Sequence, residues 1–230
     1  MIKENISNVN EKIISECNRD KIDPDSVHLI AVSKTKPLEM LKEAYDAGVR
    51  DFGENKVQEI VDKFDKMPSD TRFHMIGHLQ TNKVKYIADK VYMIHSVDSY
   101  KLAAQIDKYA KNCNRIIPIL IEVNIADEES KFGIAPSECI DFVKSISTFS
   151  NIKISGLMTV APFTENPESN RAYFRQMKQL SVDITNENID NVFMNVLSMG
   201  MTGDYIVAVS EGATYVRVGT GIFGKRNYDI

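Results

Sequence analysis

Short β-branched runs alternate with amphipathic helical stretches along nearly the whole chain, and this alternation constrains the fold more than any other feature. It is the pattern of βα units, in which each helix returns the chain to begin a parallel neighbour of the preceding strand. Eight strands are predicted, at Val27–Val32, Arg50–Phe52, Phe73–Ile76, Tyr92–His95, Ile117–Val123, Ile154–Met158, Val192–Leu197 and Tyr215–Val218. Helices are predicted at Leu38–Ala47, Val57–Lys66, Lys83–Ala88, Tyr100–Lys111, Ser137–Phe149, Glu168–Asn186 and Gly203–Glu211, and before the first strand at Ile2–Cys17.

This order of elements favours a closed barrel. Eight parallel strands with helices between them fit a (β/α)₈ TIM barrel better than an open doubly wound sheet. No Gly-x-Gly-x-x-Gly motif of the dinucleotide-binding type opens the first of these helices. The 230 residues are 43% hydrophobic and contain no linker rich in proline, glycine or serine. We therefore predict a single barrel domain over residues 1–230, with an extra N-terminal helix.

Composition argues against several classes of function. The net charge of −4 offers no basic surface for a phosphate backbone, so no nucleic-acid partner is predicted. The longest apolar run, Ile116–Val123, includes Pro118 and is far shorter than the ~20 residues of a membrane span. The N-terminus lacks a secretory pattern and the 3 cysteines are scattered, which predicts a cytoplasmic protein. The histidines lie on separate predicted elements, and no metal site is predicted.

Lys34 ends the apolar run that begins at His28, directly before Thr35, Lys36 and Pro37 turn the chain toward a helix. An amine at the end of a buried strand lies at the mouth of the core, where desolvation favours the neutral, nucleophilic form that attacks a carbonyl. The chemistry that this position suggests is a Schiff base. By position alone, a solvated residue at the strand boundary is the more common alternative.

Two glycine-containing segments are predicted to lie close to Lys34. In a closed barrel the eighth strand pairs with the first, so the end of Tyr215–Gly221 comes beside this lysine. Barrels of this class often bind phosphate with the loops after strands seven and eight and the N-terminus of a short extra helix. Here Ser198–Asp204 and Gly219–Gly224 each supply hydroxyls, glycines and a helix start. One such turn is weak support, but two beside a lysine predict a phosphate site.

Arg217 is the third element of the predicted site, because strand parity gives it the same orientation as Tyr215 and Gly219. A guanidinium that projects into a barrel interior is costly without a hydrogen-bonding partner, which is either an acidic side chain such as Glu122 or a ligand atom. A lysine for an aldehyde, amides and hydroxyls for a phosphate, and an arginine for a ring match the functional groups of pyridoxal 5′-phosphate (PLP).

Motifs spread from residue 29 to residue 228 carry a resemblance to a known family. They are Leu29–Pro37, Phe52–Glu59, His74–Lys83, Ser130–Gly133, Gly156–Met158, Leu197–Met201 with Asp204, and Arg217–Tyr228. With these motifs the chain resembles the pyridoxal phosphate homeostasis proteins, single-domain relatives of the alanine racemase N-terminal domain. The resemblance implies the barrel of PLP fold type III, and ordered motifs over most of the chain make it far more specific than any one loop.

The resemblance also implies how PLP is held. It implies that Lys34 carries the cofactor covalently as an internal aldimine, that Asn55 lines the ring and that Arg217 faces the pyridine nitrogen. The residues that it implies for the phosphate are Ser198, Met199, Gly200, Met201, Gly219 and Thr220. Lys36 is the rival attachment point, but it lies past the strand end, so Lys34 is preferred.

The expected function is that of a PLP carrier or buffer in intracellular PLP homeostasis, with no catalytic residue. An arginine opposite the ring nitrogen disfavours its protonation and makes the ring a poorer electron sink than a carboxylate would. The alternative is a PLP-dependent amino-acid racemase, but the resemblance implies that in full-length relatives a second β domain supplies a catalytic tyrosine, and we expect no room for that domain after the eighth strand. A cofactor-free Schiff-base aldolase is a further alternative, as is an interaction module that uses Lys83 and Lys85.

Apo-enzymes that use PLP are the predicted recipients of the cofactor, and a monomer is expected. Lys131 lies in the loop after the fifth strand and is either a secondary cofactor contact or, as we favour, the partner of Glu128 or Glu129 in a salt bridge. Tyr228 is expected to pack against the end of the barrel without a catalytic role.

Overall fold

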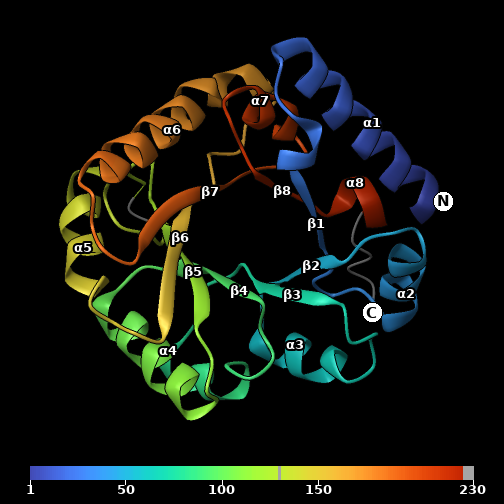
Figure 1. Ribbon diagram of the computed structural model, residues 1–230. Helices are drawn as coiled ribbons and strands as arrows, with labels where there is room; N and C mark the ends of the chain where they lie inside the picture. Colours follow the sequence, from blue (N-terminus) through green and yellow to red (C-terminus); the bar gives the residue numbers. More distant parts are fainter. Residues whose placement is uncertain (129–130, 225–230) are drawn as a thin grey trace.

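A computed structural model describes residues 1–128 and 131–224, and its strands form a closed parallel barrel (Figure 1). The strands are β1 (His28–Val32), β2 (Asp51–Glu54), β3 (Arg72–Met75), β4 (Met93–Val97), β5 (Ile117–Glu122), β6 (Ile152–Met158), β7 (Val192–Met201) and β8 (Tyr215–Val218). Each strand pairs with the next, and β8 pairs with β1. The predicted barrel is therefore confirmed.

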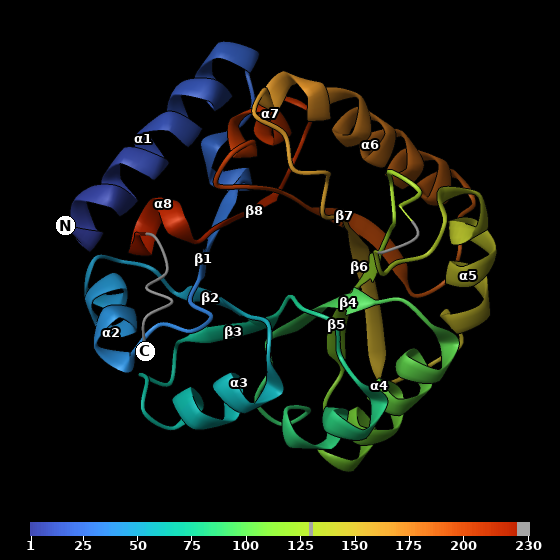
Figure 2. The same cartoon turned by 180° about the vertical axis from the view of Figure 1, so that it is seen from behind.

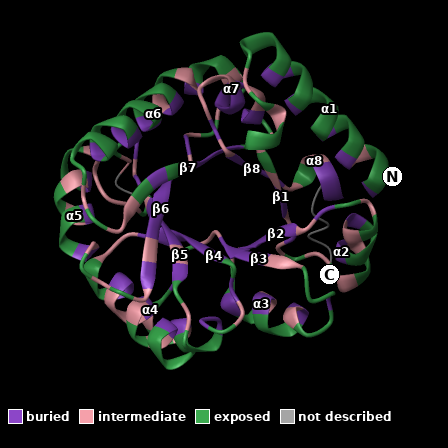
Figure 3. Ribbon diagram, viewed as in Figure 1, coloured by how far each residue is buried: buried purple, intermediate pink, exposed green. Residues whose placement is uncertain are grey.

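Helices surround the barrel on its outside, as both views along its axis show (Figures 1 and 2). The α-helices are α1 (Ile2–Asp20), α2 (Leu38–Asp46), α3 (Val57–Phe64), α4 (Tyr100–Asn112), α5 (Cys139–Ile146), α6 (Arg171–Asn186), α7 (Tyr205–Ser210) and α8 (Thr220–Phe223). Figure 3 shows the outer faces of the helices exposed and most of the strands buried. The main core therefore lies between the helices and the sheet, where apolar stripes of both meet.

Three predicted helices begin with, or consist of, a 3-10 turn in the structure. The segment predicted at Lys83–Ala88 is a short 3-10 helix, Thr81–Tyr86, which has no side-chain cap at its start. Further 3-10 turns, Pro136–Glu138 and Pro167–Asn170, precede α5 and α6. Each of these two turns starts with a proline, which has no N–H to leave unbonded in a first turn.

The largest difference concerns β7, which continues to Met201 instead of ending at Leu197. The prediction that Ser198–Met201 forms a loop was therefore wrong. The strand continues because its register with β8 shifts between Ser198 and Met201, so that the bulged end still pairs. Gly200 has φ 85°, and a Cβ there would lie 2.5 Å from the Cβ of Ala208 on α7, so only glycine fits at this position of the bulged strand end.

Two kinds of side chain share the interior of the barrel. Paired residues of neighbouring parallel strands point to the same face of a sheet, and β1 pairs Ile30 with Arg217 of β8. An apolar group, Met93, Leu120 and Met158, fills one part of the interior. A polar group joined by hydrogen bonds fills the other part and comprises Asp51, His74, His95, Ser198 and Arg217. The barrel thus holds an unusual amount of buried polar chemistry.

The N-terminal helix α1 lies outside the closure of the barrel, next to α2, α7 and α8 (Figure 1). Its buried residues Ile2, Ile6, Val9 and Ile13 recur every three or four positions, which places them on one face of the helix. The side-chain amide of Asn5 donates to the backbone carbonyl of Ile222 in α8 at 2.8 Å. This helix therefore belongs to the same core as the barrel.

Replacing Ile6 with alanine tests how firmly α1 holds the barrel. Ile6 is 3% exposed, so Ile6→Ala leaves a cavity and is expected to lower the free energy of unfolding by about 2–4 kcal/mol. Ile14 lies on the same helix but is 46% exposed, and Ile14→Ala is expected to change it by less than about 0.5 kcal/mol. Denaturant titration measures both, and equal losses would contradict the role of the buried face.

Candidate functional site

The predicted site residues lie at the carboxyl ends of their strands. Lys34 follows the end of β1 by two residues, Asn55 follows β2 directly, and Gly219 follows β8 directly. Thr220 begins α8, and Ser198–Met201 forms the last four residues of β7. Because all the strands are parallel, these ends share one face of the barrel.

Barrel closure brings the lysine and the residues of strand eight together. Ile30 of β1 is the register partner of Arg217, four residues before Lys34. Further along the same two strands, a Cβ at Gly219 would lie 3.4 Å from the Cβ of Val32. The sequence separates these strands widely, but their pairing makes them neighbours, as the sequence analysis expected.

A buried ionic group behind the end of β1 holds the backbone just before Lys34. The hydroxyl of Ser33 donates to Glu54 Oε1 at 2.6 Å. The amine of Lys63 donates to the same oxygen at 2.8 Å and to the Ser33 carbonyl at 3.0 Å. Glu54 is fully buried, and its burial raises the pKa of the carboxyl to about 7, against the opposing effect of Lys63. We call Ser33, Glu54, Glu59 and Lys63 the Glu54 cluster.

The Glu54 cluster also holds the backbone just after Lys34. Thr35 has φ 61°, a left-handed conformation that β-branched residues rarely adopt. Its N–H donates to Glu59 Oε2 at 2.8 Å, and the amine of Lys63 donates to the same oxygen at 3.0 Å. The residues on both sides of Lys34 are therefore fixed by one set of charged groups, which sets where the lysine leaves the strand.

Lys36, the rival attachment point, points elsewhere. Its amine donates to the backbone carbonyls of Phe223 at 3.2 Å and Gly224 at 3.3 Å, at the end of α8. A cation at this place satisfies carbonyls that a helix C-terminus leaves unbonded. The preference for Lys34 therefore rests on the strand position together with this separate role of Lys36.

Arg217 is 4% exposed and is held by two neutral acceptors. One terminal nitrogen donates to the hydroxyl of Ser198 and the other to the backbone carbonyl of Thr159, each at 2.7 Å. Burial lowers the pKa of Arg217 to about 10, and the charge of Glu122 acts in the opposite direction. Glu122 makes no ion pair with this arginine among the residues described, and its Oε2 atom is buried there without a hydrogen-bond partner.

Several residues predicted for the phosphate have their polar groups engaged within the protein. Ser198 is fully buried, with its hydroxyl between Arg217 and His95. Met199 is fully buried in the core outside the barrel, and the N–H of Met201 donates to Asp204 Oδ1 at 2.7 Å. The hydroxyl of Thr202 accepts from the N–H groups of Gly219 and Gly221 at 3.3 and 3.4 Å. Thr202 lies in the predicted Ser198–Asp204 segment but not among the residues that the resemblance implies.

Four residues that were not predicted as parts of the site are His74, His95, Glu54 and Lys63. A signal was present, because Glu54 and His74 both lie inside motifs that carry the family resemblance. Lys131 is exposed and its N–H donates to the Glu128 carbonyl, but the described residues show no ion pair between Lys131 and Glu128. Glu129 and Tyr228 lie outside the described residues.

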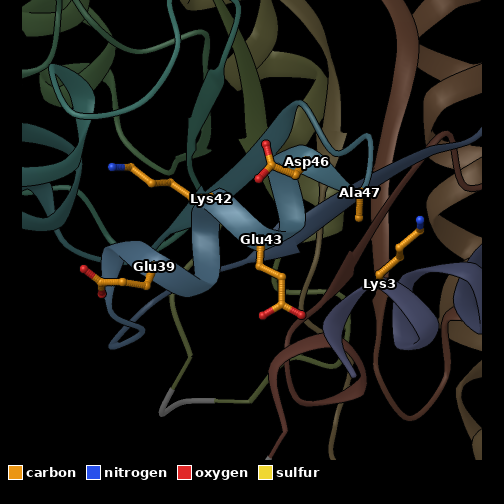
Figure 4. Close-up of a pocket in the computed structure, with 6 residues that line it drawn as sticks. All are labelled: Lys3, Glu39, Lys42, Glu43, Asp46 and Ala47. Atoms are coloured by element: carbon orange, nitrogen blue, oxygen red, sulfur yellow. The ribbon is translucent and has the colours of Figure 1, made fainter.

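A surface groove of about 550 Å³ lies between α1 and α2, and none of the predicted site residues lines it (Figure 4). Its lining is Lys3, Glu39, Lys42, Glu43, Asp46 and Ala47. Within residues 1–128 and 131–224, no cluster of His, Cys, Asp and Glu has the arrangement of a metal site. No helix in this part of the chain has both the length and the apolar character needed to cross a membrane.

Comparison with known proteins identifies the family. The family model of the alanine racemase N-terminal domain matches residues 15–227. A pyridoxal phosphate homeostasis protein of Aquifex aeolicus is 42% identical over 226 residues, which cover 98% of each chain. The Escherichia coli protein of the same name is 35% identical, over 99% of this chain and 97% of its own. This chain belongs to the pyridoxal phosphate homeostasis protein family.

Solved structures agree with the family membership. PipY of Synechococcus elongatus with PLP bound has a TM-score of 0.83 and 33% identity, covering 97% of this chain and 100% of PipY. Alanine racemase of Clostridium difficile, at 13% identity and a TM-score of 0.75, shows the shared barrel alone. The resemblance drawn from the motifs is thereby confirmed, and the Lys34 end of the barrel is the candidate site of a family member.

The buried carboxyl of Glu122 is expected to make the free energy of unfolding depend on pH. Burial, reinforced by Asp98, raises the pKa of Glu122 to about 7, so folding favours its protonated form. Stability from this group is present at low pH and is lost as pH rises toward 7, because the folded state then releases a proton that the unfolded state has already lost. Relative to wild type, Glu122→Gln is expected to gain about 2 kcal/mol between pH 5 and pH 8. Denaturant titrations of wild type and Glu122→Gln at several pH values measure both free energies of unfolding. A difference between the two proteins that does not change with pH would contradict this prediction.

Proposed function

We propose that this chain binds PLP covalently through Lys34 and acts as a carrier or buffer of PLP in cellular homeostasis. Family membership supports the proposal, as does the PipY structure with PLP bound, whose chain is 33% identical to this one. The observation that carries it is the juxtaposition of one lysine and one buried arginine at the same end of paired strands β1 and β8.

The residues at this end of the barrel fit the functional groups of PLP. Lys34 would supply an amine that forms a C=N bond with the aldehyde carbon of the ligand, with loss of one water molecule. The Glu54 cluster holds the backbone on both sides of Lys34, so the amine is presented from a fixed point. Hydrolysis of the same bond releases the ligand unchanged, as a carrier requires.

Arg217 is assigned to the ring nitrogen. The two hydrogen bonds described above use two of the five N–H donors of a guanidinium, so donors are left for a ring acceptor. A permanently charged donor disfavours protonation of that nitrogen, which weakens the ring as an electron sink. Asn55 is assigned to the ring edge. Its backbone packs closely on the next loop, since a Cβ at Gly77 would lie 2.6 Å from the backbone carbonyl oxygen of Asn55.

The phosphate is assigned to the neighbouring ends of β7 and β8. The backbone can approach a phosphate closely at Gly200 and Gly219, which have no side chain, and Thr220 adds an exposed hydroxyl. Met201 contributes through backbone, and Ser198 and Met199 contribute by holding their neighbours, since their side chains are buried elsewhere. We also propose that the protein delivers PLP to apo-enzymes and shows no robust catalysis. We expect it to be a cytoplasmic monomer with a single domain over residues 1–230.

Lys34→Ala is expected to abolish the absorption band of the imine that forms when PLP is added, while the fold is kept, because the side chain serves a carbonyl and not the core. Lys36→Ala is the matched control and is expected to keep the band. Borohydride reduction followed by peptide mapping identifies the modified lysine. A reduced adduct on Lys36, or an undiminished band in Lys34→Ala, would overturn the attachment site.

Amino-acid racemisation is the competing function, and deuterium exchange separates the two. A racemase removes the Cα proton of its substrate, whereas a carrier has neither the acid–base pair nor the electron sink for this step. The PLP-loaded protein is therefore expected to exchange the Cα proton of alanine or serine with solvent deuterium no faster than free PLP does. Exchange at an enzymatic rate that disappears in Lys34→Ala would replace the carrier proposal with the racemase.

A further inference from the structure

A continuous chain of hydrogen bonds crosses the interior of the barrel from one mouth toward the other. Asp51 Oδ1 is 2.9 Å from His74 Nε2, and His74 Nδ1 is 3.0 Å from His95 Nε2. His95 Nδ1 is 2.9 Å from the hydroxyl oxygen of Ser198, which accepts from Arg217 at 2.7 Å. We call Asp51, His74, His95 and Ser198 the barrel relay.

The first member of the barrel relay is anchored at the N-terminal mouth. Asp51 begins β2 and Arg72 begins β3, and this arginine donates to both carboxylate oxygens at 2.7 and 2.5 Å. Both residues line a cavity of about 340 Å³ that also includes His28. Although burial acts in the opposite direction, hydrogen bonds from His74 and Arg72 lower the pKa of Asp51, which keeps it ionised.

Charge fixes the position of every proton in the barrel relay. Both histidines are fully buried, and their burial lowers the pKa of each below the usual range, so both rings are neutral. An ionised Asp51 can only accept, so the proton of His74 is on Nε2 and its Nδ1 accepts from His95. His95 then carries its proton on Nε2, and its Nδ1 accepts from the hydroxyl of Ser198.

The donors therefore all point the same way, from Arg217 toward Asp51. The hydroxyl of Ser198 uses its proton on His95 and presents a lone pair to the guanidinium. Each bond polarises the next in the low-dielectric interior, so the negative charge of Asp51 strengthens an acceptor two histidines away. Among the described residues, Arg217 forms no ion pair with a carboxylate, and the barrel relay supplies one of its two acceptors.

We propose that the barrel relay is a positioning device for Arg217: Asp51 fixes the tautomers of His74 and His95, and these make Ser198 an acceptor that orients the guanidinium toward the bound ring. The contact of Arg217 with the ring rests on the proposed function, whereas the tautomers and the orientation of Ser198 do not. His74 and His95 are positioning residues, because they reach the ligand only through Ser198 and Arg217.

The tautomers are tested first, on the wild-type protein without ligand. Nitrogen-15 NMR of the imidazole rings is expected to show His74 and His95 neutral and protonated on Nε2 at pH 7, because with two neutral rings and an ionised Asp51 this is the arrangement that makes all the bonds. A proton on Nδ1 of either ring, or a charged ring, at pH 7 would reverse or break the chain of donors and overturn the proposal.

The link to the ligand site is tested with His95→Phe, which keeps a ring of similar volume and removes both bonds. PLP titration followed by absorbance is expected to show about tenfold weaker binding and a shifted band, since an acceptor of a charged donor is no longer fixed. Tyr215→Phe is the matched control, because its ring lies 5.7 Å from that of His74 and 6.1 Å from that of His95. This variant removes a hydroxyl outside the barrel relay and is expected to change PLP affinity less than twofold.

Circular dichroism establishes that each variant is folded before titration. A folded His95→Phe with wild-type affinity and spectrum would overturn the positioning role, as would an equal loss in Tyr215→Phe. If His95→Phe does not fold, the smaller truncation Ser198→Ala replaces it, with the same expected loss and the same contradicting outcome. Failure of wild type to bind PLP would overturn the proposed function alone, because the tautomer measurement needs no ligand.

Discussion

The pairing of β8 with β1 is the contact on which the candidate site depends. It joins the two ends of the sheet, sets Arg217 beside Ile30 and brings Gly219 against Val32, two residues before Lys34. Neither strand carries the site alone, because the amine comes from one and the guanidinium from the other. The N-terminal helix α1 packs against the helices at this closure, so its buried isoleucines stabilise the same seam that assembles the site. Stability and binding chemistry are therefore coupled in this barrel through one pair of strands.

Two buried polar systems position the site from opposite sides of the sheet. The Glu54 cluster lies behind β1 and fixes the backbone around Lys34, including the left-handed turn at Thr35. The barrel relay lies inside the barrel and supports Arg217 through Ser198. The groups of each system are costly to bury without hydrogen bonds, and Glu54 Oε2 is already buried without a partner among the described residues, so neither system can lose a further bond without a loss of stability. The backbone around Lys34 and the guanidinium of Arg217 are thus held in place by the protein itself.

The strands and the position of Lys34 at the end of β1 could be predicted from the sequence. Periodicity of the βα units is a local property, and the pairing of the last strand with the first follows from the topology. Strand eight, Tyr215–Val218, was predicted at its observed bounds. The extension of β7 was not, since it depends on a register shift and on the fit of Gly200 against Ala208. The spacing of His74 and His95 along the chain did not bring them together, because their 3.0 Å contact depends on the pairing of β3 with β4 inside the barrel. The engagement of Ser198 with Arg217 likewise depends on which atoms face each other, which residue spacing does not encode.

The charges in the interior explain why such a site suits an anionic ligand. Arg217 keeps its positive charge, since even a pKa of about 10 leaves it protonated at neutral pH, and its described partners are a hydroxyl and a carbonyl. Glu122, the nearby acid, has its pKa raised to about 7 by burial, so near neutrality it is only partly ionised. Asp51 lies at the far mouth, where it is paired with Arg72, and takes no space beside Arg217. An anion that enters at the Lys34 end therefore meets a cation whose direct partners are neutral, and it displaces no carboxylate to reach it.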